Sequence, residues 1–219
     1  MKRKTLIVAL AVCLVAIMAF GTLAYFSAQD SVTNNFMIAD SPDPDKKPFS
    51  VKVEETIPGT EDKTTDGVTY DDIQPGDILS KDPTVINDGL YSEYVRVNVT
   101  VTSATQWQAA CAKHGITDLT TIFGGFDSTK WTLAGEPVFD ETANTLTYSY
   151  YYNGVLAPEE SAVLFTSVTI PSAFGTADME SLANFQLIVT AEAIQSEHTG
   201  DSAAEAFVLY DAQVAKEAA

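Results

Sequence analysis

"YVRVNVTV", residues 94–101, carries the clearest structural pattern in this chain of 219 residues. Valine occupies every second position from 95 to 101, and the positions between hold Tyr94, Arg96, Asn98 and Thr100. Successive side chains of a β-strand point to opposite faces of its sheet, so the alternation predicts a strand with one buried face and one solvated face. A sheet of this kind must bury its apolar face against another layer.

The same period of two recurs along the chain. Apolar residues alternate with polar ones, or share one face, at 49–53, 146–152, 164–170 and 185–193. Turn-forming residues separate these segments, at Pro75-Gly76, Asn87-Asp88-Gly89, Asn153-Gly154 and Pro158. Several half-buried strands joined in this way predict an all-β fold, an antiparallel two-sheet sandwich.

Two capping-box motifs predict helices. Residues 103–106, "SATQ", open a short helix whose apolar face carries Trp107, Ala110 and Cys111 and which ends at Gly115. Residues 202–205, "SAAE", open a terminal helix with an apolar side formed by Ala203, Phe207, Tyr210 and Val214. We expect both to be short peripheral helices that cover the ends of the sheets.

The first 24 residues have the layout of a secretory signal peptide. Three basic residues precede an uncharged apolar run from Leu6 to Phe20, Gly21 interrupts the run, and the small residue Ala24 suits a signal peptidase. We therefore predict cleavage between Ala24 and Tyr25. The alternative is an uncleaved transmembrane helix, because the run is near the length of about 18 residues that spans a bilayer.

Three segments follow from this reading: a signal peptide at 1–24, an N-terminal strand segment with a proline-rich linker at 25–48, and a β-sandwich domain at 49–219. Cleavage leaves nine Lys and Arg against 30 Asp and Glu, a net charge of −21. Such a surface repels nucleic acid and anionic lipid, so we expect no nucleic-acid partner and membrane contact only through the uncleaved signal peptide. Cys111 is the single cysteine after cleavage, so no internal disulfide can form; this is typical of proteins exported by Gram-positive bacteria.

The block "DIQPGDILSKDPTVINDGLYSEYVRVNV", residues 72–99, has physical roles of its own. Pro75 fixes φ at the second position of a tight turn, and Gly76 can take a positive φ at the third. Gly89 is expected to take a positive φ before the valine strand. Arg96 lies on the polar face of that strand, where it either pairs with an acid or binds a ligand carboxylate; we favour the pairing because the surface offers many acids.

This block, together with the signal exit "GTLAYFS", the following "TNNF" and the late strand "LANFQLIVTAEAIQ", resembles the TasA/camelysin family of Gram-positive bacteria. The matching parts cover about a third of the chain, and 103–160 matches nothing in that family. The resemblance implies processing by a dedicated SipW-type signal peptidase. It also implies a jelly-roll domain that assembles into extracellular biofilm fibres, and, for camelysin-like members, a cell-surface metallopeptidase.

Candidate catalytic and metal-binding residues are few. A catalytic zinc usually takes three protein ligands, often with two histidines on one helical turn, whereas His114 and His198 are far apart in the sequence. Carboxylate clusters at Asp71-Asp72 and at 40–45 are typical of solvated loops, and Cys111 beside Trp107 is expected to be a buried, inert thiol. We therefore predict no catalytic, metal or cofactor site and no enzymatic activity.

The segment after the signal peptide is apolar at several positions, Tyr25, Phe26, Val32, Phe36 and Ile38. An exposed apolar segment invites aggregation unless it pairs with a sheet edge. It could fold back on its own sandwich, or it could add a strand to the next copy of the chain, as in donor-strand assembly. We expect a secreted, self-assembling matrix protein that polymerises through this segment. The alternatives are a cell-surface adhesion module and, less favoured, a metallopeptidase.

Overall fold

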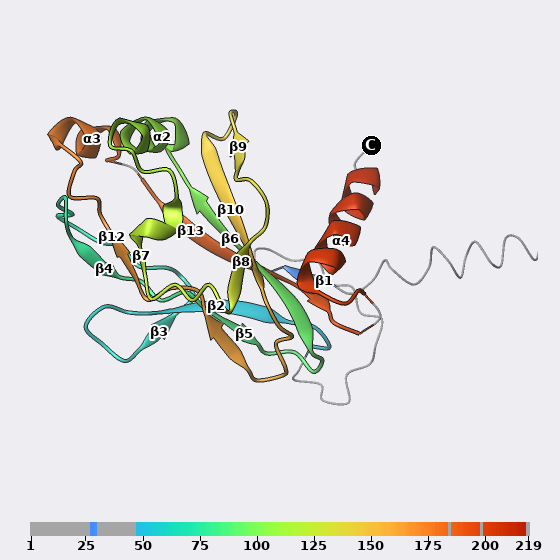
Figure 1. Cartoon of the computed structure of the whole chain (residues 1–219). Coiled ribbons are helices and arrows are strands. Elements are labelled where there is room, and N and C mark those ends of the chain that lie inside the picture. Colours follow the sequence, from blue (N-terminus) through green and yellow to red (C-terminus); the bar gives the residue numbers. More distant parts are fainter. Residues whose placement is uncertain (1–26, 30–46, 184, 198, 218–219) are drawn as a thin grey trace, which may run out of the picture.

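The computed structural model describes residues 27–29, 47–183, 185–197 and 199–217 (Figure 1). The described chain forms three antiparallel sheets with helices at their ends, which confirms the predicted all-β antiparallel sandwich. The jelly-roll connectivity stays a prediction. The predicted signal peptide lies outside the described residues, and none of the described helices has the length and apolar character needed to cross a bilayer.

The largest sheet is built around the valine strand, which is β6. Its strand order is β1 (Ser27–Gln29), β13 (Leu187–Gln195), β6 (Glu93–Val101), β10 (Thr145–Tyr152) and β8 (Trp131–Leu133), with β9 (Val138–Asp140) also paired to β10. β6 and β13 pair along nine residues, and Val99 stands opposite both Val189 and Tyr148. The alternate residues on one face of β6 therefore lie beside residues of β13 and β10 on the same face of the sheet.

Two smaller sheets form the opposing layer. One has the order β11 (Ser161–Val163), β5 (Thr84–Asn87), β2 (Val51–Thr56) and β3 (Lys63–Thr64). The other has the order β4 (Ile78–Ser80), β12 (Ser167–Thr169) and β7 (Phe123–Gly124). The single alternating strand predicted at 164–170 is wrong at its start. Strand β11 ends at Val163 and β12 begins at Ser167. Leu164 and Phe165, adjacent and both fully buried, lie between them, where the chain crosses from one small sheet to the other.

The hydrophobic core lies between these layers. The four alternating valines of β6 are each 0 % exposed and pack in one cluster with residues of both small sheets, among them Val51, Val85, Phe123 and Val168. Full burial of a valine side chain contributes about 1.5–3 kcal/mol, so this one strand supplies a substantial share of the stability. The aromatic residues Trp131, Tyr150 and Phe165 fill the remaining space.

Three helices flank the sandwich in the described residues. α2 (Ala104–Lys113) and α3 (Thr176–Ser181) lie together at one end, and α4 (Ala203–Glu217) lies at the other end beside β1 (Figure 1). α2 and α4 were predicted, and their predicted apolar residues Trp107, Cys111 and Phe207 are buried. Val214, predicted on the same side of α4, is 46 % exposed because it lies near the end of the helix, beyond the sheet. α3 was not predicted, because it is only six residues long and begins after Gly175, which is a weak capping signal.

The two predicted capping boxes have different outcomes. At α4, Ser202 Oγ accepts the N–H of Glu205 at 3.3 Å, and the Glu205 carboxylate accepts the N–H of Asp201. At α2 the prediction is wrong, because Ser103 has a left-handed backbone (φ 51°) and makes no side-chain cap. Asn144 caps this helix instead, through its carbonyl to Ala104 N–H and its Oδ1 to Thr105 N–H, both at 3.0 Å.

Candidate functional site

The edge of β13 that faces away from β6 is the candidate site for assembly. One edge of β13 pairs with β6 along its whole length. The other edge pairs with β1 at three positions only, where Ala28 stands opposite Ala193 and Gln29 opposite Glu192. From Leu187 to Ala191, this second edge forms no ladder with any other described strand. The N–H and C=O groups of a strand edge are a template for a further strand.

The residues predicted for assembly and cleavage flank β1 in the sequence. Ala24, Tyr25, Phe26, Val32, Phe36 and Ile38 are all outside the described residues. β1 falls between them and pairs with the β13 edge of its own chain, as in the fold-back alternative. The edge itself reads "LIVTA" from 187 to 191, an uncharged sequence of high β-propensity.

Arg96 fastens α4 to the outer face of this sheet. Its Nε donates to Glu192 Oε2 at 2.6 Å, and its two terminal nitrogens donate to the Asp211 carboxylate at 2.7 and 3.0 Å. The guanidinium also lies 4.4 Å from the centroid of the Phe207 ring. Burial by itself lowers the pKa of Arg96, but the bonds to Asp211 and the charge of Glu192 outweigh it and raise the pKa above its usual range. The expected pairing of Arg96 with an acid is confirmed.

A group of buried polar contacts fixes the point where the N-terminal segment joins the domain. We call it the Glu93 clamp, formed by Ser50, Asn87, Gly89, Glu93 and Leu156. The Asn87 amide donates to the carbonyl of Leu156 and accepts the N–H of Gly89. Glu93 Oε1 accepts the N–H of Ser50 at 3.2 Å, just before β2 begins. Three loops distant in sequence are thereby held together.

Glu93 itself is an unusual acid. Its side chain is 0 % exposed, and its second oxygen, Oε2, has no hydrogen-bond partner among the described residues. Burial raises the pKa of Glu93 to about 8; the bond from Ser50 opposes this shift and the charge of Asp88 adds to it. No local pattern of residues predicts this burial, because a glutamate at the start of a strand is usually solvated.

The two turn glycines of the 72–99 block have different roles. Gly76 has φ +96° and the Asp77 N–H donates to Gln74 O, which confirms the predicted tight turn. Gly89 does not have the predicted positive φ, so that prediction is wrong. A glycine is needed at position 89 because the backbone passes close to Ser50: an added Cβ would lie 2.8 Å from Ser50 N.

The candidate catalytic residues make structural contacts. Asp178 accepts Gly175 N–H at 2.9 Å, and at 3.0 Å it contacts both Lys113 Nζ and His114 Nε2, which joins α3 to α2. We call these four residues the helix junction. Burial raises the pKa of Cys111 to about 11, which keeps it a thiol at neutral pH.

The remaining metal candidates are isolated or not described. His198 and the carboxylates at 40–45 lie outside the described residues, and Asp71 and Asp72 are exposed. In the described part of the chain, no three His, Cys, Asp or Glu side chains come close enough to hold a metal ion together.

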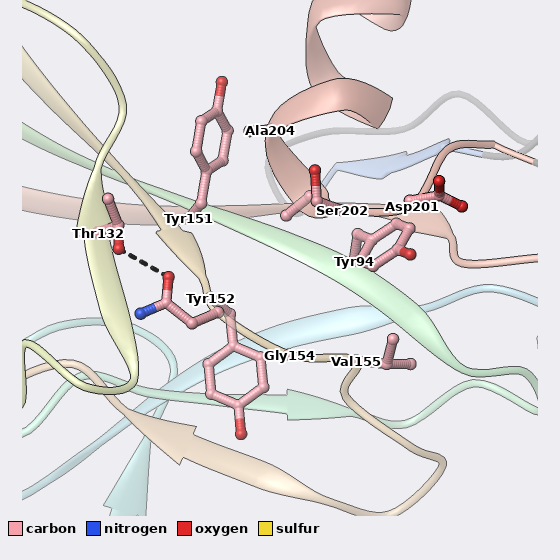
Figure 2. Close-up of a pocket in the computed structure, with 11 residues that line it drawn as sticks. Tyr94, Thr132, Tyr151, Tyr152, Gly154, Val155, Asp201, Ser202 and Ala204 are labelled. Carbon is pink, nitrogen blue, oxygen red and sulfur yellow. Dashed lines mark hydrogen bonds between the residues drawn. The ribbon is translucent and has the colours of Figure 1, made fainter.

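Two shallow hollows mark the surface. The first, about 280 Å³, lies between the end of β10 and the start of α4 (Figure 2). Tyr151 and Tyr152 point to opposite sides of their strand there, so only part of each ring borders the hollow. Its polar groups bond one another: Thr132 Oγ1 donates to Asn153 Oδ1 at 2.7 Å, and Tyr94 Oη donates to Gly200 O.

Comparison with protein-family models, with curated proteins and with solved structures found no match to this chain.

Proposed function

We propose that this protein is a secreted structural subunit that polymerises by strand addition, in the manner of the TasA/camelysin proteins that its sequence resembles. Residues 25–40 of one copy would pair with the β13 edge of the next. The observation that carries this proposal is the edge from Leu187 to Ala191, which no described strand covers although β1 begins a ladder beside it.

Strand addition is favourable for both the incoming segment and the strand that accepts it. The incoming segment provides backbone partners for the exposed N–H and C=O groups of β13, and its apolar side chains leave water. A neighbour's segment that continues the register of β1 would place Val32 opposite Val189. Because donor and acceptor surfaces differ, each added copy presents a fresh edge, and repetition builds an open fibre.

The Glu93 clamp supports this arrangement. It fixes Ser50 to the body of the domain, so the preceding segment leaves from a defined point. The linker "SPDPDKKP" at 41–48 contains three prolines, which disfavour a tight hairpin back onto β2 and favour an extended reach.

Export and processing complete the proposal. A SipW-type signal peptidase would cut between Ala24 and Tyr25, and release would place the apolar segment outside the cell with the domain. The net charge of −21 on the mature chain keeps the subunits soluble until a strand is exchanged.

Deletion of Tyr25 to Asn35 tests the function. The truncated protein should remain folded and strand-rich by circular dichroism but form no filaments in electron micrographs. A control of equal length, with these residues replaced by a Gly/Ser sequence, should behave like the deletion. Filaments from either variant, or a full-length mature protein that stays monomeric at high concentration, would contradict the proposal.

A cysteine pair distinguishes exchange between copies from folding back. Ala28 and Ala193 stand opposite each other in the ladder, so Ala28→Cys with Ala193→Cys should cross-link under oxidation. Exchange gives a ladder of covalent oligomers on a non-reducing gel, whereas folding back gives a cross-linked monomer. The native Cys111 is buried and does not compete.

A monomeric surface-binding module is the second candidate. A second hollow on the molecule favours this candidate, because aromatic, acidic and hydroxyl side chains line it. A ligand could bind there whether or not the protein polymerises.

A further inference from the structure

The second hollow, of about 400 Å³, lies beside β8, β10 and the 3₁₀ turn at Leu119–Ile122. This volume is within the range of small-ligand sites. Its floor is aromatic, with Trp131 and Tyr150 each 1 % exposed. Phe126 and Tyr148 form the walls, and the Phe126 ring meets Tyr150 edge-on at 5.5 Å.

One polar group on this floor has no partner. The Tyr150 hydroxyl is buried and makes no hydrogen bond to any described residue. By contrast, the indole N–H of Trp131 on the same floor donates to Val163 O at 2.8 Å. A buried hydroxyl without a partner is costly, so native proteins usually provide one, from the chain, from water or from a ligand.

The rim of the hollow supplies acceptors and hydroxyls. Asp118 uses Oδ1 to cap the 3₁₀ turn, accepting Thr120 N–H at 2.9 Å, and its Oδ2 makes no hydrogen bond to the described residues. Glu136 is the second acid, and the remaining polar rim is made of hydroxyl side chains, Thr117, Thr120, Ser128 and Thr132. No Lys, Arg or His is among the described residues that line the hollow.

We propose that this hollow binds a neutral, hydroxyl-rich ring, the chemistry of a sugar unit. A sugar hydroxyl can accept the proton of Tyr150 and donate its own to Asp118, which satisfies both groups at once. The apolar C–H face of the ring would lie against the aromatic walls. An alkylammonium ion suits the aromatic rings and the acids, but it has no acceptor for the Tyr150 proton, so the geometry favours the sugar.

The test uses the purified full-length protein and a panel of neutral sugars: glucose, N-acetylglucosamine, cellobiose and maltose. Saturation-transfer NMR and tryptophan fluorescence should detect binding by at least one of them, with a Kd on the order of 1 mM. Trp131 lies on the floor of the hollow and serves as the fluorescent reporter.

Matched variants locate the site. Tyr150→Phe removes only the unpartnered hydroxyl, so the fold should be at least as stable while sugar affinity falls about fivefold. Asp118→Asn keeps a helix-capping side chain but removes the charged acceptor, and it should weaken binding about tenfold. Tyr151→Phe is the control, because Tyr151 is on the opposite face of β10, stacked on Phe207, and should bind sugar normally.

Three outcomes would overturn the proposal. They are the absence of binding by every sugar in the panel, unchanged affinity in Tyr150→Phe, and binding of tetramethylammonium that Asp118→Asn weakens while no sugar competes. None of these results depends on whether the protein forms filaments, so the sugar site and the proposed assembly stand or fall separately.

Discussion

The Glu93 clamp and the helix junction each depend on one carboxyl group, but the two groups are held in opposite ways. Glu93 is fully buried, with one hydrogen bond and one oxygen without a partner. Asp178 is 8 % exposed and surrounded by donors, from Gly175, Lys113 and His114. Burial without a cation raises a carboxyl pKa, and surrounding donors lower it. The two regions should therefore lose stability at opposite ends of the pH range.

The largest expected effect is the pH dependence from Glu93. Its pKa is about 8 in the folded protein against an ordinary value of 4.5, so between these limits the folded state keeps a proton that the unfolded state has lost. Stability should therefore fall as pH rises through this window, by up to about 5 kcal/mol. Urea unfolding at pH 5 and pH 8 measures it.

Glu93→Gln is the matched variant for that measurement. It keeps the shape of the protonated acid and cannot ionise, so its unfolding free energy should change much less between pH 5 and pH 8. If the unfolding free energy fell equally in both proteins, a group other than Glu93 would be responsible for the pH dependence.

A pair of glycine substitutions should give the next largest effect. Gly89→Ala in the clamp puts a Cβ 2.8 Å from Ser50 N and 3.1 Å from Pro48 O, both backbone atoms, so it should destabilise by about 2 kcal/mol. Gly175→Ala at the junction meets only Asp178 Oδ2, at 3.8 Å, so it causes no clash and should cost about 0.5–1 kcal/mol, as a poorer N-cap. Thermal unfolding of the two variants compares them directly, and equal losses would show that the clamp is not tightly packed.

The smallest effect is expected at Asp178. Bonds from Gly175, His114 and Lys113 hold the pKa of this carboxyl well below its usual range, so its contribution is present above pH 4 and is lost as pH falls further. Asp178→Asn should lower the melting temperature modestly at pH 7, and its difference from the native protein should shrink as the pH falls below 4. The effect is small because Lys113 is largely solvated, with 57 % of its side chain exposed. If the difference in melting temperature between Asp178→Asn and the native protein grew on acidification, the lowered pKa of Asp178 would be contradicted.

The sequence predicted the regular elements well where a local period was present. The alternating valines of β6 and the apolar face of α4 were found because burial on one face leaves a repeat within a few neighbouring residues. The prediction failed at 164–170, where two adjacent side chains are both buried at a crossover between sheets. It failed also at Ser103, where Asn144, distant in sequence, caps the helix.

The candidate sites were harder to predict from the sequence than the strands and helices. An acid partner for Arg96 could be expected, but Glu192 and Asp211 are 96 and 115 positions away, and only the packing of β13 and α4 selects them. The hollow beside Tyr150 takes its residues from a 3₁₀ turn, two strands and the loops next to them. The partner-free hydroxyl had no sequence signal, because tyrosine on an inward-facing position is ordinary.

What the sequence alone determined is what depends on near neighbours and on composition: the alternation of the strands, the apolar sides of the helices and the strong acidity of the chain. The tertiary structure decided which strand edge pairs with β1, which glycine is needed for close approach and which carboxyl keeps its proton. These properties depend on the distance to water and to atoms far along the chain. That distance is set only when the sheets pack together, so no local pattern of residues can encode it.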